Sequence, residues 1–556
     1  MRLIEANERV IYQLYPKSFK DSNGDGIGDL GGIIEKLDYL KDLGVNTIWL
    51  NPIYVSPQVD NGYDVSDLYA IDPSFGTLEQ FDELINKAHA KGIEVILDLV
   101  LNHTSDKHPW FQSAISDINS PYRDYYIWRQ GKKDGKEPNN WASFFGGSVW
   151  QKDPLIENNY YFHLFDKAMP DLNWQEPKVR QEMINVAKFW IDHGVDGFRL
   201  DAFIHLAKAD LVQDMLTDSN KPVLAEMFYA NLPQVKTYLT EFISQLKAIK
   251  PGLFILGEAA SADVDLAITY TTPKETSCDT VVTFRYFYED DSRIDHALPT
   301  NGQPKKLDLM ALKQNMLEWQ KRLENVSTQT LYWSNHDMPR ILDRFDPKTD
   351  KQACAKMLAT LMYLQRGSVC LYYGEELGMQ AKTLEDISDF EDQQMVEFAK
   401  QATKKGWSNE KILDSVSRSH KMAARFPLRF DDSKYGGFSD VRPWKWTTKG
   451  KDVSSIKEQL ADKTSILNFY RQILRLKQEQ VFSHGIYRLE NTDQRLYVYR
   501  RLLDDKEALV ICNLSEEQVT YPYETDKKII LKQNVTLDQA KETLVLAAYG
   551  SVVLVK

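Results

Sequence analysis

The feature that most constrains the fold is a repeated alternation of helix-like and strand-like segments. A helical pattern over 33–44 precedes the apolar run VNTIWLNPIY, and a second helical pattern, TLEQFDELINKAHAKG, precedes IEVILDLVLNH. Such continuously apolar strands are typical of a parallel sheet that is covered on both faces. Strands that alternate with helices over short loops predict an α/β fold, either a barrel or a doubly wound sheet. No G-x-G-x-x-G motif follows the first strand, VIYQLYP, which argues against dinucleotide binding.

The alternation is interrupted once and changes in character near the end. Between Thr104 and Met169 the chain is rich in aromatic residues, Gly, Pro and Asn, and the alternation resumes at Asp171. So long an interruption after a strand is usually a functional insertion. After the helical run SILNFYRQILRLKQEQ, short alternating strands predict a C-terminal antiparallel β domain. We therefore expect a main α/β domain over 1–103 and 171–478, an inserted domain over 104–170, and a C-terminal β-sandwich domain over 479–556.

Composition excludes several classes of partner. The 556-residue chain has a formal net charge of −12, which disfavours nucleic acid and anionic lipid as main partners. No apolar run approaches the ~18 residues of a membrane helix, and no signal peptide is visible. The cysteines are scattered without C-x-x-C spacing, so we expect reduced thiols and a cytoplasmic protein. They are Cys278, Cys354, Cys370 and Cys512.

An acidic, glycine-rich loop, DSNGDGIGDLGG, follows the first strand. Oxygens at every second position of such a loop can converge on one hard cation, as in the first part of an EF-hand. The closing glutamate of an EF-hand is missing, because Gly32 stands there. The alternative is a solvated acidic turn. We expect a structural Ca²⁺, with Mg²⁺ as the other candidate, bound by Asp21, Asn23, Asp25, the carbonyl oxygen of Ile27, and Asp29.

Charged and imidazole side chains stand at the ends of several expected strands. In GVDGFRLDAF, Arg199 and Asp201 are two positions apart and would point to one face of a strand. A carboxylate beside an arginine stays ionised and is a candidate nucleophile, although an ordinary buried ion pair would look the same. If the sheet is a barrel, the C-terminal strand ends surround one site. The other strand ends carry Asp98, Asn102 and His103, then Glu258, then Asn335, His336 and Asp337.

These blocks resemble the α-amylase superfamily, glycoside hydrolase family 13, in residues and in order. The opening YQ-Y-P-SF-DSNGDGIGDL, the NGYDV block, MPDLN from Met169 and GEELGM from Gly374 are similar to the group of oligo-1,6-glucosidases, dextran glucosidases and α-glucosidases. The resemblance covers nearly the whole chain. It implies a (β/α)8 TIM barrel, an inserted loop-rich domain after strand 3 and a C-terminal antiparallel β domain.

The resemblance also implies roles for individual residues. It makes Asp201 the nucleophile, Glu258 the general acid/base and Asp337 the third carboxylate of a retaining glycosidase. Arg199 would keep Asp201 charged, and like-charge proximity would raise the pKa of Glu258. His103 and His336 would bind sugar hydroxyls. The remaining residues expected in the wall of the sugar site are Tyr63, Asp64, Phe145 and Arg425. Asp64 and Arg425 could pair and close the site at one end, which would restrict it to chain ends. For Phe145, packing in a core is the alternative.

Two departures from the group's pattern bear on specificity. Around Arg425 the chain reads ARFPLRFDD where relatives have RTPMQWDD, so Leu428, Arg429 and Phe430 differ. After the nucleophile, α-1,6-acting relatives tend to have Val and α-1,4-acting relatives Thr, whereas this chain has Ala202. A capped site implies action at chain ends, and the general similarity, including Ala259 after the acid, predicts short isomalto-oligosaccharides as substrates. We expect a monomer.

Three alternatives stay open at this point. They are an α-1,4-glucosidase of maltose or sucrose type, a transglycosylating or isomerising relative, and a non-catalytic binding protein. Sucrose isomerases carry RLDRD where this chain has DSRIDHALP, and all three carboxylates are present, so hydrolysis is preferred.

Overall fold

The computed structural model describes residues 4–447, 453–490 and 492–556. Eight parallel strands form a closed barrel in the order β1-β15-β14-β11-β10-β9-β5-β2, which confirms the predicted fold class. The barrel strands are β1 (Val10–Leu14), β2 (Thr47–Leu50), β5 (Glu94–Val100), β9 (Gly197–Asp201), β10 (Phe254–Glu258), β11 (Thr280–Val282), β14 (Thr328–Leu331) and β15 (Ser368–Tyr372).

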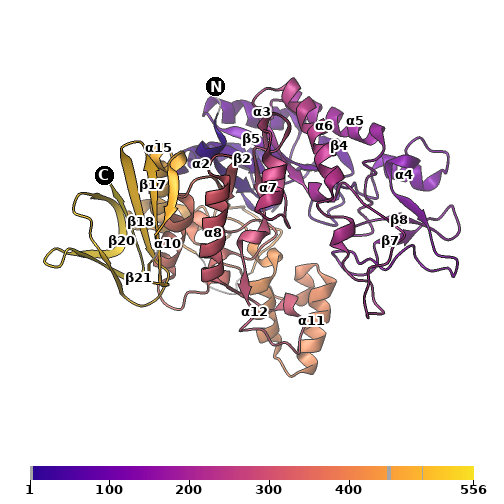
Figure 1. Cartoon of the computed structure of the whole chain (residues 1–556). Coiled ribbons are helices and arrows are strands. Elements are labelled where there is room, and N and C mark those ends of the chain that lie inside the picture. The colour runs from indigo at the N-terminus through magenta and orange to yellow at the C-terminus, as the bar shows by residue number, and fades with distance from the viewer. Residues whose placement is uncertain (1–3, 448–452, 491) are drawn as a thin grey trace. The chain divides into compact units, whose positions relative to one another are not determined.

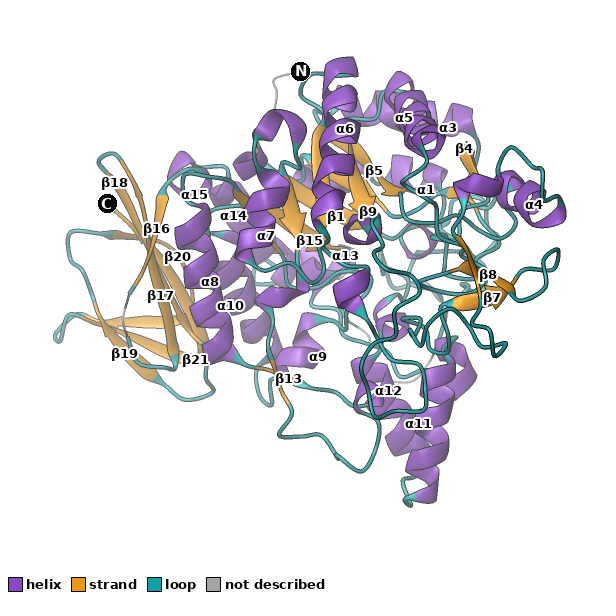
Figure 2. Cartoon of the chain, turned by 45° about the vertical axis from the view of Figure 1, so that its right-hand side comes forward, coloured by secondary structure: helices purple, strands orange, loops and turns teal. Residues whose placement is uncertain are grey.

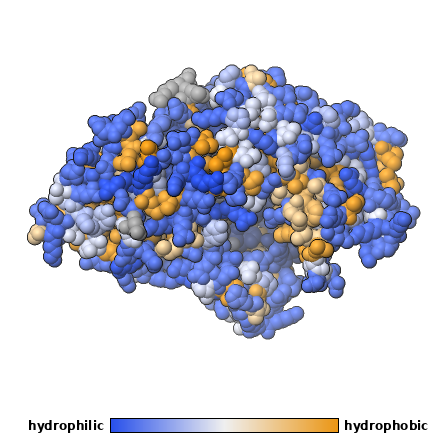
Figure 3. Space-filling model, in the orientation of Figure 1, coloured by the Kyte–Doolittle hydropathy of each residue, from blue (hydrophilic) through white to orange (hydrophobic). Residues whose placement is uncertain are grey.

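The chain divides into two compact units. The first contains Met1–Ile48, Lys87–Ile93 and Tyr286–Lys556, and the second contains Trp49–Asn86 and Glu94–Arg285. Each is described by itself below. None of the helices in the described residues is long and apolar enough to cross a membrane. The face shown in Figure 3 is mostly hydrophilic, with apolar residues in small groups.

In the first unit, β1 pairs with β15 and β14 pairs with β15, all parallel. The C-terminal sheet is antiparallel, and α10 (Lys351–Tyr363) packs against one of its faces, beside β18 and β21 (Figure 1). Its strands are β16 (Ile486–Leu489), β17 (Leu496–Leu503), β18 (Lys506–Asn513), β19 (Val519–Pro522), β20 (Lys528–Asp538) and β21 (Thr543–Val555).

In sequence, the other helices of the first unit lie between barrel strands or after the last of them, β15. Helices α11 (Gln393–Lys404) and α12 (Asn409–Ser419) lie side by side in Figures 1 and 2. The remaining elements are α1 (Leu30–Glu35), α2 (Leu37–Leu43), α8 (Leu309–Leu323), α9 (Ile341–Phe345), α13 (Ile456–Ala461), α14 (Ile466–Lys477), α15 (Gln480–Ser483), β12 (Glu289–Asp290) and β13 (Lys306–Leu307).

In the second unit, β9 lies between β5 and β10. Helix α5 (Pro177–Asp192) leads into β9: Pro177 occupies its first turn, its apolar residues are buried, and Gly194, with φ of +90°, turns the chain after its end. Within β9, a Cβ atom on Gly197 would lie 2.1 Å from the carbonyl oxygen of Phe254, so glycine permits the close pairing with β10. The other elements are α6 (Pro233–Ile249), α7 (Val264–Thr271), β3 (Tyr54–Val55) and β4 (Asp67–Ile71), and α3 (Leu78–Ala90) bridges the sequence ranges of both units.

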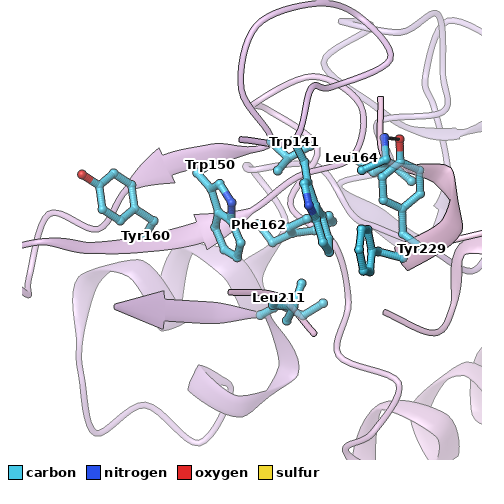
Figure 4. Close-up of a cluster of buried hydrophobic side chains, with 11 residues drawn as sticks. Trp141, Trp150, Tyr160, Phe162, Leu164, Leu211 and Tyr229 are labelled. Carbon is cyan, nitrogen blue, oxygen red and sulfur yellow. Dashed lines mark hydrogen bonds between the residues drawn. The ribbon is translucent and has the colours of Figure 1, made fainter. Parts of the chain in front are cut away.

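The inserted region has a small aromatic core of its own. It contains α4 (Pro109–Ser116) and a sheet in the order β6 (Trp128–Gln130), β8 (Asn159–Phe162), β7 (Trp150–Lys152), and β7 and β8 are visible in Figure 2. Trp141, Trp150 and Phe162 pack together in this core (Figure 4). The segment that follows β9 completes it, since Leu211, Ala225, Phe228 and Tyr229 belong to the same cluster.

Candidate active site

Arg199 connects three carboxylates that come from three neighbouring barrel strands. Its Nη1 donates to Asp98 Oδ1 and to Asp201 Oδ1, each over 2.5 Å. Its Nη2 lies 2.9 Å from Glu258 Oε2. Because Asp98 and Arg199 are direct partners in the β5–β9 register, the carboxylate and guanidinium are level across the sheet. The structure thus brings the predicted residues Arg199, Asp201 and Glu258 into one group.

The charge balance of this group follows from its burial. Only 2% of the Arg199 side chain is exposed. Burial alone would lower the pKa of Arg199, but the charges of Asp98 and Glu258 and, more weakly, Asp201 raise it well above its ordinary value. Burial raises the pKa of Asp98, while Arg199 opposes that shift. The guanidinium is therefore a permanent positive charge beside Asp201 and Glu258.

Asp98 is held by neutral donors as well as by Arg199. Its Oδ2 accepts from Trp49 Nε1 at 3.0 Å, from Asn51 Nδ2 at 3.2 Å and from the Tyr63 hydroxyl at 2.9 Å. The predicted wall residue Tyr63 is thereby fixed to the same network. The sequence places Asp98 at a strand end, but no motif gives it a role. Its position opposite Arg199 in the β5–β9 register identifies it as part of this group.

The residue after Asp201 also acts on Glu258. Ala202 has φ of 47° and ψ of 23°, in the left-handed region, and its amide donates to Glu258 Oε2 over 3.1 Å. Oε2 thus accepts from two N–H donors, Ala202 and Arg199. When Glu258 is protonated, the proton must be on Oε1, because a protonated Oε2 would point at these donors.

His103 lies just after β5 with its ring buried. Among the residues that the structure describes, its Nε2 has no hydrogen-bond partner. Burial lowers the pKa of His103 to about 4, so the ring is neutral near pH 7. A buried ring nitrogen without a protein partner suits a hydroxyl group of a ligand.

Asp64 and Phe145 lie in different surroundings. Asp64 is fully buried and accepts from Ser56 Oγ at 2.9 Å and from two backbone amides. Phe145 is 39% exposed, which excludes simple core packing. Its ring contacts Phe165, and Phe165 in turn contacts the His103 ring at 5.2 Å between centroids.

In the first unit, three predicted residues meet around one carboxylate. Gln13 Nε2 lies 2.7 Å from His336 Nδ1, and His336 Nε2 lies 3.1 Å from Asp337 Oδ2. Because an amide nitrogen only donates, Nδ1 accepts and Nε2–H faces Asp337. Arg425 donates from Nε to the His336 carbonyl at 2.9 Å, and its Nη2 lies 3.4 Å from Asp337 Oδ1.

Lys421 was missed by sequence reasoning. Its Nζ lies 3.0 Å from Asp337 Oδ1, on the same oxygen as Arg425. It stands four residues before Arg425, and no motif marked it. Of the residues that depart from the group's pattern in the ARFPLRFDD block, Phe430 packs against the rings of Phe19 and Tyr39.

Some predicted relationships join residues of the two separately described units. Asp201 and Glu258 belong to the second unit and Asp337 to the first, as do Asp64 and Arg425 respectively. That Asp337 joins the other two carboxylates, and that Asp64 pairs with Arg425, therefore stay predictions.

The acidic loop folds back on its own amides. Asp21, Asn23 and Asp25 each accept from the amide two residues later, at 3.1, 2.9 and 2.8 Å. Asp29 caps α1 by accepting from the Gly32 amide at 2.7 Å. Burial alone would raise the pKa of Asp21, but hydrogen bonds from Ser439 and from loop amides lower it. Within the described ranges, no group of three or more His, Cys, Asp or Glu side chains is arranged to hold a metal ion.

Comparisons with known proteins agree with this geometry. The family described as "Alpha amylase, catalytic domain" matches residues 13–485. The oligo-1,6-glucosidase of Halalkalibacterium halodurans is 39% identical over 512 residues, which cover 91% of this chain and 90% of that protein. The trehalose-6-phosphate hydrolase of Bacillus subtilis is 35% identical over 558 residues, covering 98% and 97%.

Solved structures show the same likeness over the full length. A family GH13_31 enzyme superposes with a TM-score of 0.92 at 46% identity, covering 99% of both chains. The trehalulose synthase MutB of Pseudomonas mesoacidophila superposes with a TM-score of 0.87 at 32% identity, also over 99% of both chains. The chain therefore belongs to the α-amylase family of glycoside hydrolases, family 13.

Proposed function

We propose that the protein is an exo-acting, retaining α-glucosidase that releases terminal α-1,6-linked glucose from short isomalto-oligosaccharides. The observation that carries the proposal is the single guanidinium of Arg199 that contacts both Asp201 and Glu258. It supports a pair of carboxylates close together, as retaining glycosidases require, at ~5–5.5 Å. Several relatives 37–39% identical to this chain are named oligo-1,6-glucosidase, which supports the substrate class.

In the first step, Glu258 protonates the glycosidic oxygen from Oε1 and Asp201 attacks the anomeric carbon. The C–O bond to the leaving sugar breaks, and a covalent glucosyl ester on Asp201 forms. Arg199 holds Asp201 ionised for the attack. Because Arg199 and the Ala202 amide occupy Oε2 of Glu258, the acidic proton is directed to the other oxygen.

In the second step, Glu258 removes a proton from a water molecule, which attacks the same carbon from the side that the leaving sugar vacated. The ester bond breaks and glucose leaves with its anomeric configuration retained. Asp337 is the third carboxylate of the proposal and binds sugar hydroxyls. His336 and Lys421, which contact it, hold its orientation.

The remaining proposed contacts define a site for one terminal glucose. His103 offers an unoccupied ring nitrogen, and Tyr63 lies on the Asp98 network. Phe145 is available as an exposed aromatic face beside Phe165. Asp64 and Arg425 are proposed to close the site at the non-reducing end, which would restrict the enzyme to chain ends.

Ala202 leaves the linkage open in principle, since it matches neither Val nor Thr. The names of the relatives favour α-1,6, and α-1,4 is the second candidate. An isomerase finds less support, although a trehalulose synthase is among the similar structures. All three charged residues of the DSRID stretch form ion pairs: Asp291 with Lys305, Arg293 with Asp346 and Asp295 with Lys405.

The test is the initial rate of glucose release from isomaltose, isomaltotriose, maltose and sucrose at matched concentrations. The proposal expects the first two to be preferred, with α-glucose as the first product in an NMR time course. Faster release from maltose or sucrose would reject the α-1,6 assignment and keep the catalytic residues. Asp201→Ala is the control, because a folded variant that still hydrolyses would remove Asp201 as the nucleophile.

A structural Ca²⁺ in the acidic loop is part of the proposal. The loop offers carboxylate and amide oxygens on alternate residues, the donor type that Ca²⁺ and Mg²⁺ prefer. Asp21, Asn23, Asp25, the Ile27 carbonyl and Asp29 would hold the ion, which would stabilise the loop without contacting the sugar.

A cytoplasmic monomer is also proposed. The four cysteines are free and buried, which supports a reducing compartment.

A further inference from the structure

A short 3-10 helix, η11 (Lys421–Ala424), connects the two cations that contact one oxygen of Asp337. Lys421 is the first residue of this helix, and Arg425 directly follows its last residue. Lys421 Nζ lies 3.0 Å and Arg425 Nη2 lies 3.4 Å from Asp337 Oδ1. The surroundings of this carboxylate oxygen therefore depend on what holds the two ends of η11.

The end of η11 is held by side chains from elsewhere in the first unit. Arg340 Nη2 donates to the Ala424 carbonyl at 2.8 Å, and Ser18 Oγ donates to the Arg425 carbonyl at 2.6 Å. Arg425 Nε in turn donates to the His336 carbonyl at 2.9 Å. These contacts fix the arginine end of the helix, and the lysine end is held by a different set.

His420 holds the start of η11. Its backbone amide donates to the Val416 carbonyl at 2.9 Å and ends α12, while its ring Nδ1 accepts from the Met422 amide at 3.3 Å and caps η11. Because a backbone amide only donates, Nδ1 carries no proton. Burial lowers the pKa of His420, although Asp392 opposes that shift, so the ring is neutral near pH 7. Its proton is therefore on Nε2.

The Nε2–H of His420 faces a carboxylate at the other end of the α11–α12 pair. Asp392 Oδ2 lies 3.2 Å from Nε2, and Asp392 Oδ1 accepts from the Gln394 amide at 2.7 Å as the N-cap of α11. Burial alone would raise the pKa of Asp392, but the hydrogen bonds from His420 and the Gln394 amide lower it. One ionised carboxylate thus joins the start of α11 to the end of α12, the two helices that lie side by side in Figure 2.

We propose that His420 and Asp392 are positioning residues for Asp337, because they anchor the start of η11 and thereby hold the Lys421 ammonium against Asp337 Oδ1. The inference rests on the proposed function for the role of Asp337, but the chain of contacts from Asp392 to Lys421 does not. Neither His420 nor Asp392 is proposed to contact the sugar. The α11–α12 pair thereby acts on turnover through a single short helix.

The first experiment is the kcat/KM of Asp392→Ser for 4-nitrophenyl α-glucoside. Serine keeps an N-cap for α11 and removes the oxygen that faces His420, so kcat/KM should fall by roughly tenfold. Asp308→Ser makes the same change at the N-cap of α8, where Asp308 accepts from two amides, and it should keep the kcat/KM of the wild type. An Asp392→Ser enzyme as active as the wild type would overturn the proposal.

A double-mutant cycle separates positioning from a structural role. Lys421→Met removes the ammonium on which Asp392 is proposed to act, so adding Asp392→Ser to it should lower kcat/KM no further. A residue that only stabilises the helix pair would act in both backgrounds. Independent losses, amounting to roughly a hundredfold in the double variant, would therefore refute the proposal.

His420 variants cover the case in which Asp392→Ser does not fold. Asparagine is a good N-cap and keeps an acceptor for the Met422 amide, whereas alanine removes both contacts of the ring. His420→Ala should therefore lose roughly tenfold in kcat/KM, and His420→Asn should recover part of that loss. A His420→Ala enzyme with the kcat/KM of the wild type would overturn the role of His420.

A measurement without substrate separates this inference from the proposed function. In ¹⁵N NMR of the full chain labelled at histidine, near pH 7, His420 should appear as the neutral Nε2–H tautomer, and His420→Asn assigns its signal by loss. An Nδ1–H signal would overturn the chain of contacts whatever the enzyme hydrolyses. A wild type that shows the Nε2–H signal and hydrolyses no glucoside would reject the proposed function, and with it the role of the chain in turnover.

Discussion

The amide of Ala202 donates to Glu258 Oε2 over 3.1 Å from a backbone in the left-handed conformation. A non-glycine residue in this conformation costs of order 1 kcal/mol or more, and such strain persists where the surroundings determine it. The strained position therefore links the strand that carries the proposed nucleophile to the proposed general acid, because residue 202 directly follows Asp201. It also lies where the linkage-determining side chain is expected.

Ala202→Val should lower stability and change linkage preference together. A β-branched side chain is disfavoured at φ of 47°, so the melting temperature should fall by a few degrees, equivalent to about 1–2 kcal/mol. The added methyl groups should narrow the leaving-group side and raise the ratio of kcat/KM for isomaltose over maltose. Ala202→Gly is the matched control, expected to keep the ratio and the amide contact. An unchanged ratio in Ala202→Val would show that residue 202 does not select the linkage here.

Asp98→Asn should damage both stability and turnover although Asp98 is not proposed to touch the sugar. The change leaves the buried guanidinium of Arg199 with one compensating charge fewer, at a cost of about 3–5 kcal/mol. Misplacement of Tyr63 and Arg199 should lower kcat/KM by roughly 100-fold. Trp49→Phe removes one neutral donor to Asp98 and leaves a small cavity, because Trp49 is fully buried, and it should cost about 2 kcal/mol in urea unfolding. Equal effects of the two variants would mean that the charge of Asp98 is unimportant.

The fold and the strand-end residues could be predicted because their signals are local. Continuous apolar runs and helical periodicity identify barrel strands, and Arg199 and Asp201 share a face by the two-residue period. The grouping of Asp98 with Arg199 needed the register of β5 against β9, which no periodicity provides. The resemblance supplied the roles of Asp201 and Glu258, and the structure supplied their shared contact with Arg199.

Other residues could not be predicted because their partners are distant in sequence. Lys208 reaches Asn102 across 106 positions, and Lys421 reaches Asp337 across 84. A lysine in an unmarked stretch is usually exposed, so burial of Lys208 became visible only in three dimensions. The core of the inserted region was similarly extended by Phe228 and Tyr229, which no composition change marked.

His108→Asn should make the protein less sensitive to acid. The buried ring accepts from the Trp110 amide at 3.2 Å, and burial lowers the pKa of His108 to about 4. Between pH 4 and the pKa of about 6.5 that histidine has in the unfolded chain, the unfolded chain binds more protons than the folded chain. Stability is therefore full above about pH 6.5 and is lost as pH falls toward 4, by at most about 3 kcal/mol for this residue.

Asparagine keeps a cap acceptor for α4 and cannot titrate, so the slope of unfolding free energy between pH 6.5 and 4 should decrease. His296→Asn, at an exposed position, should leave the slope as it is. Urea unfolding at several pH values measures both. An unaltered slope in His108→Asn would show that its ring is not a source of acid sensitivity.

Glu375→Gln should stabilise the protein at alkaline pH. Glu375 is buried, Tyr363 and Tyr470 donate to its Oε1, and burial raises its pKa to about 8. Between pH 4.5 and pH 8, the folded chain therefore binds more protons than the unfolded chain. Stability is full below about pH 4.5 and is lost as pH rises through 8, by at most about 5 kcal/mol.

Glutamine cannot lose a proton, so Glu375→Gln should remain stable from pH 5 to 9 while the wild type weakens. Glu385→Gln, at an exposed position, is the control and should follow the wild type. Thermal unfolding from pH 5 to 9 gives the comparison. Parallel curves for wild type and Glu375→Gln would mean that Glu375 does not titrate in this range.

Calcium should raise the melting temperature through the acidic loop, and EGTA should lower it. Hydrogen bonds from Ser439 and the loop amides hold the pKa of Asp21 below its usual value, against the effect of burial, so the loop stays negatively charged. A cation that binds only the folded loop stabilises by about 2.7 kcal/mol at 100 times its dissociation constant.

Asp25→Asn removes an exposed charge that makes no ion pair in the described residues, and it should abolish the response to Ca²⁺. Asp218→Asn, an exposed position outside the loop, should keep the response. Two results together would contradict a bound ion: Asp25→Asn is more stable than the wild type without Ca²⁺, and the melting temperature of the wild type responds to neither Ca²⁺ nor EGTA. The loop would then be a turn whose carboxylates accept from its own amides and are destabilised by their mutual repulsion.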